Sequence, residues 1–151
     1  MSNHLISSYQ QLPVAFTEGS GAWLTDTRGE RYLDALAGIA VCVLGHAHPQ
    51  VTRAIAEQAG RLLHTSNLYH IPLQEQLADR LTALSGMDRV FFCNSGAEAN
   101  EAAIKISRLF ARRKKITHPE IIVAHRSFHG RTLATLSATG SDKVRAGFEP
   151  L

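Results

Sequence analysis

Apolar and polar positions follow different periods along the chain, and each period predicts a different kind of element. Near the amino end, apolar residues alternate with polar ones on both sides of the turn at 26–29, which predicts a β-hairpin. Residues 49–63 and 72–86 carry apolar side chains at helical spacing, and prolines lie near the start of each segment, at Pro49 and Pro72. Both segments are therefore predicted to be helices.

Two short apolar runs, 89–93 and 120–125, each lie between predicted helices. Runs of this length are typical of strands that are buried on both faces of a sheet. A long helix is predicted at 97–113 and a shorter one at 131–138. The order helix, strand, helix, strand, helix predicts an α/β fold with parallel strands.

Composition agrees with a folded protein, because 44% of the 151 residues are hydrophobic and only 19% are charged. A parallel sheet normally has more than two strands, so we expect the sequence to be part of a larger domain. The chain shows no signal-peptide pattern and no apolar stretch of membrane-spanning length. Cys42 and Cys93 match no zinc-binding spacing. We therefore expect a cytoplasmic protein with no metal site and no membrane association.

The turn that follows the run 89–93 is the first candidate site. The first N–H groups of a helix have no intrahelical partner and carry partial positive charge, so they bind anions well. Gly96 lets a ligand approach the backbone closely, and Ala97 is the next smallest choice. Ser95 and Glu98 have the spacing of a capping box. The pattern alone leaves two alternatives open, a phosphate site and an ordinary helix cap without a ligand.

Charged residues on the long helix have simpler interpretations. Glu101 and Lys105 are four residues apart, which predicts a surface ion pair. A basic cluster at 108–115 could indicate a nucleic-acid binder. That cluster lies at the end of the helix, where positive charge is favourable, and it matches no recognisable nucleic-acid-binding motif. We therefore expect no nucleic-acid partner.

Two motifs, NSGAEANEAAIK and SFHGRT, together closely resemble the class-III aminotransferases, which depend on pyridoxal 5'-phosphate (PLP). The segment TDTRGERYLDALAGIAVCVLGHAHPQV resembles the amino-terminal region of that family, and SNLYHIPLQEQLA resembles its acetylornithine/succinylornithine branch. The resemblance implies the amino-terminal part of the fold-type I PLP-dependent transferase fold. Residues 1–50 would be the N-terminal segment of the small domain. Residues 51–151 would be the first part of the PLP-binding large domain, with an incomplete parallel sheet.

The same resemblance assigns roles to five residues. Gly96 and Ala97 match the pair that binds the cofactor phosphate, and Ser95 supports that turn. Phe128 matches the aromatic residue that stacks on the pyridine ring, and Arg131 matches the arginine that holds the substrate α-carboxylate. Without the resemblance, the residues would favour a core-packing role for Phe128, and they would allow Arg131 to be a solvated arginine in the first turn of a helix.

The resemblance also implies an activity, the transfer of the δ-amino group of N2-acetylornithine to the small oxo acid 2-oxoglutarate, in arginine biosynthesis. The full-length enzyme is expected to be a homodimer. The family's Schiff-base lysine is expected beyond Leu151, so we expect no catalytic residue in these 151 residues and no activity from them alone. Two alternatives stay open. One is another class-III ω-amino acid transaminase, acting on ornithine, succinylornithine or 4-aminobutyrate; the other is a non-catalytic phosphate- or cofactor-binding fragment.

Overall fold

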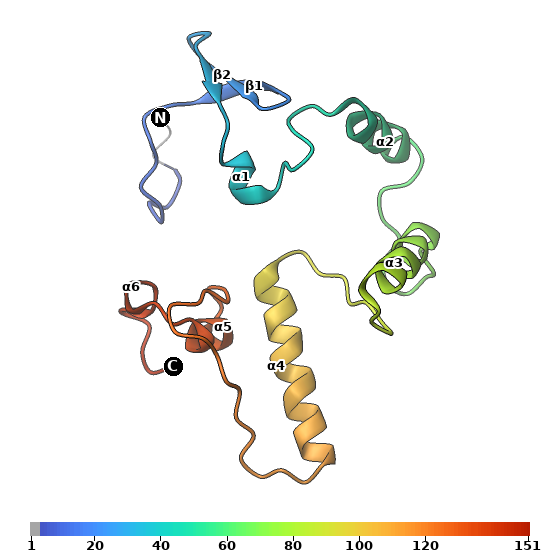
Figure 1. Cartoon of the computed structure of the whole chain (residues 1–151), viewed down its shortest axis with the longest axis vertical. Helices are drawn as coiled ribbons and strands as arrows, with labels where there is room; N and C mark the ends of the chain where they lie inside the picture. Colours follow the sequence, from blue (N-terminus) through green and yellow to red (C-terminus); the bar gives the residue numbers. More distant parts are fainter. Residues whose placement is uncertain (1–3) are drawn as a thin grey trace. The chain divides into compact units, whose positions relative to one another are not determined.

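The computed structural model describes residues 4–151, which form two compact units, one ending at His70 and one beginning at Ile71 (Figure 1). The first unit contains strands β1 (Phe16–Ser20), β2 (Trp23–Asp26) and β3 (Arg31–Leu33) and helices α1 (Ala37–Ala40) and α2 (Pro49–Ala59). The second unit contains helices α3 (Pro72–Ser85), α4 (Gly96–Arg113), α5 (Leu133–Ala138) and α6 (Asp142–Arg145).

The three strands of the first unit form an antiparallel sheet in the order β1-β2-β3, and the predicted hairpin connects β2 to β3. Its turn is organised by Asp26, whose buried carboxylate accepts hydrogen bonds from the backbone N–H groups of Arg28 (2.8 Å) and Glu30 (2.9 Å). Burial raises the pKa of Asp26, but these hydrogen bonds outweigh it, and the net pKa lies below its ordinary value. The turn is therefore stabilised by an ionised aspartate.

A second carboxylate organises the segment that follows the sheet. Asp34 accepts hydrogen bonds from the N–H groups of Leu36 (3.0 Å) and Ala37 (2.8 Å), and its other oxygen lies 2.6 Å from His46 Nε2. The hydrogen bond with His46 is the largest cause that lowers the pKa of Asp34. His46 also forms an isolated β-bridge with Gly21. Residues 34–46 are thereby closed into a loop against the sheet.

The helices predicted at 49–63, 72–86 and 97–113 are confirmed as α2, α3 and α4, although α2 ends at Ala59, before the predicted end. Helix α3 begins at Pro72 and ends before Gly86, whose φ of 70° is a conformation that glycine adopts without strain. The predicted helix at 131–138 is confirmed as α5, which begins slightly later.

The strands predicted at 89–93 and 120–125 do not form in the structure. Among residues 4–151 the sheet is the antiparallel one, and neither run belongs to a strand. Phe91 is 65% exposed and Ile122 is 98% exposed. A strand exists only when a neighbour pairs with its N–H and C=O groups, and neither run has such a neighbour in the described part of the chain. Both apolar runs carry a strand-like sequence pattern, but within residues 4–151 neither pairs with another strand.

Helices α4 and α5 lie next to each other in the second unit (Figure 1). Thr135 and Thr139 are fully buried there, and Leu136 is also buried. Many large apolar side chains elsewhere in the described chain are exposed, so residues 4–151 do not bury a large hydrophobic core by themselves. None of the helices in residues 4–151 combines the length and apolarity needed to cross a membrane.

Candidate active site

Helix α4 begins with a cap that holds its first turn in place. Ser95 is the N-cap residue in extended conformation, and its hydroxyl accepts a hydrogen bond from the N–H of Glu98 at 3.2 Å. This confirms the predicted cap between Ser95 and Glu98. The helix carries Glu98 in its first turn and Arg112 and Arg113 in its last, as the helix dipole favours.

In a standard capping box the Glu98 carboxylate would accept a hydrogen bond from the N–H of the N-cap residue, Ser95, but here its partner is the preceding residue. It accepts hydrogen bonds from the backbone N–H of Asn94 at 2.7 Å and from the Asn94 side chain at 3.3 Å, and the Ser95 hydroxyl lies 3.4 Å away. The side-chain hydrogen bond from Asn94 is the largest cause that lowers the pKa of Glu98 below its ordinary 4.5. The carboxylate is therefore ionised at neutral pH and is compensated by its own donors.

Two backbone N–H groups at this helix end stay available. Within residues 4–151, the N–H groups of Gly96 and Ala97 donate no hydrogen bond, because they belong to the first turn and the cap uses the N–H of Glu98 instead. A Cβ built on Gly96 would meet no atom within 4 Å. The structure therefore leaves open space directly beside two unpaired donors, which is the arrangement that binds a phosphate.

The loop before α5 carries the other two predicted residues. Phe128 is 62% exposed and Arg131 is also exposed, so neither is a buried core residue. Between them, Gly130 has a φ of 135°, and a Cβ there would lie 2.8 Å from the Cβ of Ala97. The loop therefore lies directly against the first turn of α4. The structure brings together the five residues that the sequence singled out, Ser95, Gly96, Ala97, Phe128 and Arg131, in one region of the second unit.

Two residues that join these parts were not recognised as such in the sequence. Asn100 donates a hydrogen bond from its side chain to the backbone carbonyl of His129 at 2.7 Å. Glu101 accepts a hydrogen bond from the hydroxyl of Thr132, and no ion pair joins Glu101 to Lys105 in the described chain, so that predicted pair is wrong. Their spacing from Ala97 could have indicated this role, because residues three and four positions after Ala97 lie on the same face of the helix.

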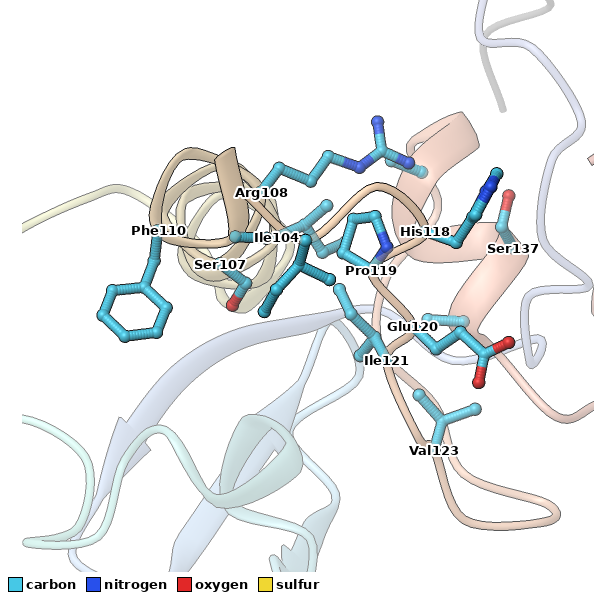
Figure 2. Close-up of a pocket in the computed structure, with 14 residues that line it drawn as sticks. Ile104, Ser107, Arg108, Phe110, His118, Pro119, Glu120, Ile121, Val123 and Ser137 are labelled. Atoms are coloured by element: carbon cyan, nitrogen blue, oxygen red, sulfur yellow. The ribbon is translucent and has the colours of Figure 1, made fainter. Parts of the chain in front are cut away.

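One cavity of the second unit lies away from these residues. It has a volume of about 480 Å³ and opens between α4, the segment at 116–123 and α5 (Figure 2). Ile121 and Val123 both line it, while Ile122 between them is almost fully exposed. This alternation is that of a strand with one covered face. None of the five predicted site residues lines the cavity, so it is not the candidate active site.

The described residues do not contain a cluster of side chains suited to bind a metal ion. No group of three or more histidine, cysteine, aspartate or glutamate side chains in residues 4–151 could hold a metal ion. His46, which follows a glycine in the GHAHP motif, binds Asp34 instead.

Comparison with known proteins decides the family. The model of the aminotransferase class-III family matches residues 6–151. The chain belongs to the class-III aminotransferases. The acetylornithine aminotransferase of Nitrosomonas europaea is 61% identical to it over 149 residues, which are 99% of this chain and 38% of that enzyme. This class-III aminotransferase chain therefore spans about 38% of the length of that curated relative.

Solved structures of other aminotransferases share the fold. An ornithine aminotransferase structure from Toxoplasma gondii, which reveals partial occupancy of PLP at its active site, matches with a TM-score of 0.90 and 31% identity. That match covers 99% of this chain and 36% of the other. The N-acetylornithine aminotransferase of Stenotrophomonas maltophilia matches with a TM-score of 0.75 and 44% identity, over 82% of this chain and 35% of that one. The predicted fold class, the amino-terminal part of the fold-type I transferase fold, is confirmed.

Proposed function

We propose that this chain is the amino-terminal part of a PLP-dependent aminotransferase, a cytoplasmic homodimer that transfers the δ-amino group of N2-acetylornithine to 2-oxoglutarate. One observation carries the proposal. The first turn of α4, which carries the two open N–H groups, contacts through Ala97 the loop that presents Phe128 and Arg131. A phosphate site, an aromatic face and a guanidinium group thus come from adjacent segments, and these three groups match a phosphorylated aromatic cofactor and a carboxylated substrate.

The residues present fit PLP. Gly96 and Ala97 would hold its phosphate through their backbone N–H groups, and Ser95 would keep the turn in shape through its cap. Phe128 would cover one face of the ring, which its exposure allows. When bound, PLP supplies the electron sink that amino-group transfer requires. The position of Gly96 supports this fit most directly, because the fold itself has no atom where its Cβ would stand.

Arg131 would bind and orient the amino donor. A guanidinium forms two parallel hydrogen bonds with a carboxylate, so it fixes both the position and the rotation of the group. Held in this way, the donor would present its terminal amino group to the cofactor at a constant distance from the carboxylate. This geometry suits a donor whose amino group and carboxylate are separated by a fixed carbon chain, and N2-acetylornithine is such a donor.

A second substrate has support of its own. The Toxoplasma gondii ornithine aminotransferase matches with the higher TM-score, although its sequence identity is only 31%. Ornithine carries a free α-ammonium where N2-acetylornithine carries a neutral amide. The 61% identity to an acetylornithine aminotransferase favours the acetylated donor.

A panel of amino donors tests the proposal. The full-length protein, supplied with PLP and 2-oxoglutarate, should form glutamate from N2-acetylornithine with a kcat/KM at least about tenfold above that for ornithine, succinylornithine or 4-aminobutyrate. A preference for ornithine would replace the proposed substrate with the alternative. Failure to form glutamate from any of the four donors would refute the aminotransferase activity. Sedimentation of the same preparation tests the homodimer, and a monomeric active enzyme would contradict it.

A further inference from the structure

The loop that carries Arg131 is fixed to helix α4 at two points, one on each side of it. Ahead of Arg131, the side-chain amide of Asn100 donates to the carbonyl of His129 at 2.7 Å. After it, the hydroxyl of Thr132 donates to the carboxylate of Glu101. Asn100 and Glu101 are consecutive residues in the second turn of α4, so both attachments originate from one rigid place.

That place is close to the proposed phosphate site. Asn100 and Glu101 lie three and four residues after Ala97, on the same face of the helix. Gly130 touches the same face, because a Cβ there would lie 2.8 Å from the Cβ of Ala97. The loop and the phosphate turn therefore share one short stretch of helix as their common support.

The other side of the loop is fixed to α5. The N–H of His129 donates to the hydroxyl of Thr139 at 3.1 Å, and that hydroxyl donates to the carbonyl of Thr135 at 2.9 Å. Both threonines are fully buried. The backbone on both sides of Arg131 is thus held between two helices, while the Arg131 side chain itself is exposed.

We propose that Asn100 and Glu101 are positioning residues for the amino donor, which set the distance between the Arg131 guanidinium and the cofactor phosphate. The inference rests on the proposed function, because it assumes that Arg131 binds the donor carboxylate. Neither residue touches the reacting atoms; both act through the loop. A displacement of the loop by about 1 Å would lengthen and misalign the paired hydrogen bonds between Arg131 and the donor carboxylate, so the donor would bind more weakly.

A merely structural role makes a different prediction. If the two side chains only stabilised the fold, their loss would lower the melting temperature and the amount of active enzyme, and KM would not change. If they act through Arg131, their loss should raise KM for the donor, and that effect should disappear once Arg131 no longer makes its paired hydrogen bonds.

The experiment is a double-mutant cycle in the full-length enzyme loaded with PLP. Asn100→Ala should raise KM for N2-acetylornithine about five- to tenfold, the scale of one lost hydrogen bond, with kcat changed less than about twofold. In an Arg131→Lys background the same substitution should change KM less than about twofold. The PLP dissociation constant, measured by equilibrium dialysis, should change less than about twofold, since the phosphate turn is untouched.

Glu101 provides an independent second arm if Asn100→Ala does not fold. Glu101→Ala should raise KM in the same way, whereas Glu101→Gln, which keeps an acceptor for the Thr132 hydroxyl, should restore it to within about twofold of the unmodified enzyme. Gln58→Ala is the matched control, because Gln58 also donates from its amide to a backbone carbonyl, that of Leu62 at 2.8 Å, but in the first unit. It should leave KM unchanged.

The outcomes separate the two proposals. An unmodified full-length enzyme that transfers no amino group overturns the proposed function, and this inference with it. Two results in an active enzyme overturn only the positioning role. In one, Asn100→Ala leaves KM unchanged; in the other, it raises KM by the same factor in the unmodified and in the Arg131→Lys enzyme.

Discussion

Gly96 offers a sharp test of the phosphate site. A side chain at this position should not disturb the fold, but it should obstruct a ligand that approaches the backbone. Its φ lies outside the left-handed region, and a Cβ built on it would meet no atom within 4 Å. An alanine at this position is therefore compatible with the protein alone. The space beside it is needed only if a ligand approaches the backbone there.

The expected magnitudes follow from this difference. Replacing a glycine in a helix by alanine changes stability by about 1 kcal/mol at most, and in the favourable direction. A hydrogen bond to a charged group contributes about 1.5–3 kcal/mol, so obstructing one N–H to phosphate contact should weaken PLP binding roughly 10- to 150-fold. Gly96→Val should weaken binding more than Gly96→Ala, because its side chain is larger.

The assay is equilibrium dialysis of PLP against the full-length apoenzyme, alongside thermal melting without cofactor. Gly60→Ala is the matched control, since Gly60 also has an ordinary φ of −72° and a Cβ there makes only normal contacts, at 3.6 Å. The control should bind PLP like the unmodified protein. If both Gly96 variants bind PLP with unchanged affinity, the phosphate does not lie at this helix end. If they unfold the apoenzyme, the fold itself requires the glycine, which contradicts the premise that the open space serves a ligand.

Three other changes test separate parts of the account. Arg131→Lys keeps the charge but loses the planar fork. It should reduce kcat/KM for the amino donor by an amount that corresponds to roughly 1–3 kcal/mol of lost transition-state stabilisation, with little change in PLP affinity. A loss confined to PLP affinity would contradict its role. Gly130→Ala should destabilise the full-length protein by about 1–3 kcal/mol in chemical denaturation, because its Cβ would lie 2.5 Å from the Thr135 hydroxyl at a φ of 135°, and an unchanged midpoint would contradict the close contact. The pKa of Asp34 is lowered in the folded state, so its stabilising effect is present above its ordinary value of 3.8 and is lost as the pH falls below it. Asp34→Asn should therefore lower the melting temperature at pH 7 and lower it less at a pH below 3.8, and an equal loss at both pH values would refute the assignment.

Local features of this fold were predictable from sequence. The hairpin turn is held by Asp26, and the start of α4 by Ser95 and Glu98, through contacts no more than four residues apart. Pro72 and Gly86 mark the ends of α3 for similarly local reasons. Such signals need no knowledge of the rest of the chain, which explains why they were read correctly.

Contacts between distant segments were not predictable. The strands expected at 89–93 and 120–125 need partners that no local pattern specifies, and the structure leaves both unpaired. The contacts of Asn100 and Glu101 join residues that are 29 and 31 positions apart. For Glu101 the local alternative, a pair with Lys105, was plausible on spacing but is worth only a few tenths of a kcal/mol on a helix surface. A distant hydroxyl is the partner in the structure.

The most direct test of the whole account is a crystal structure of the full-length protein with PLP bound. We expect phosphate oxygens about 2.7–3.2 Å from the backbone nitrogens of Gly96 and Ala97, the pyridine ring against Phe128, and Arg131 directed at the substrate side of the ring. A cofactor phosphate bound elsewhere, with the first turn of α4 exposed to solvent, would contradict it.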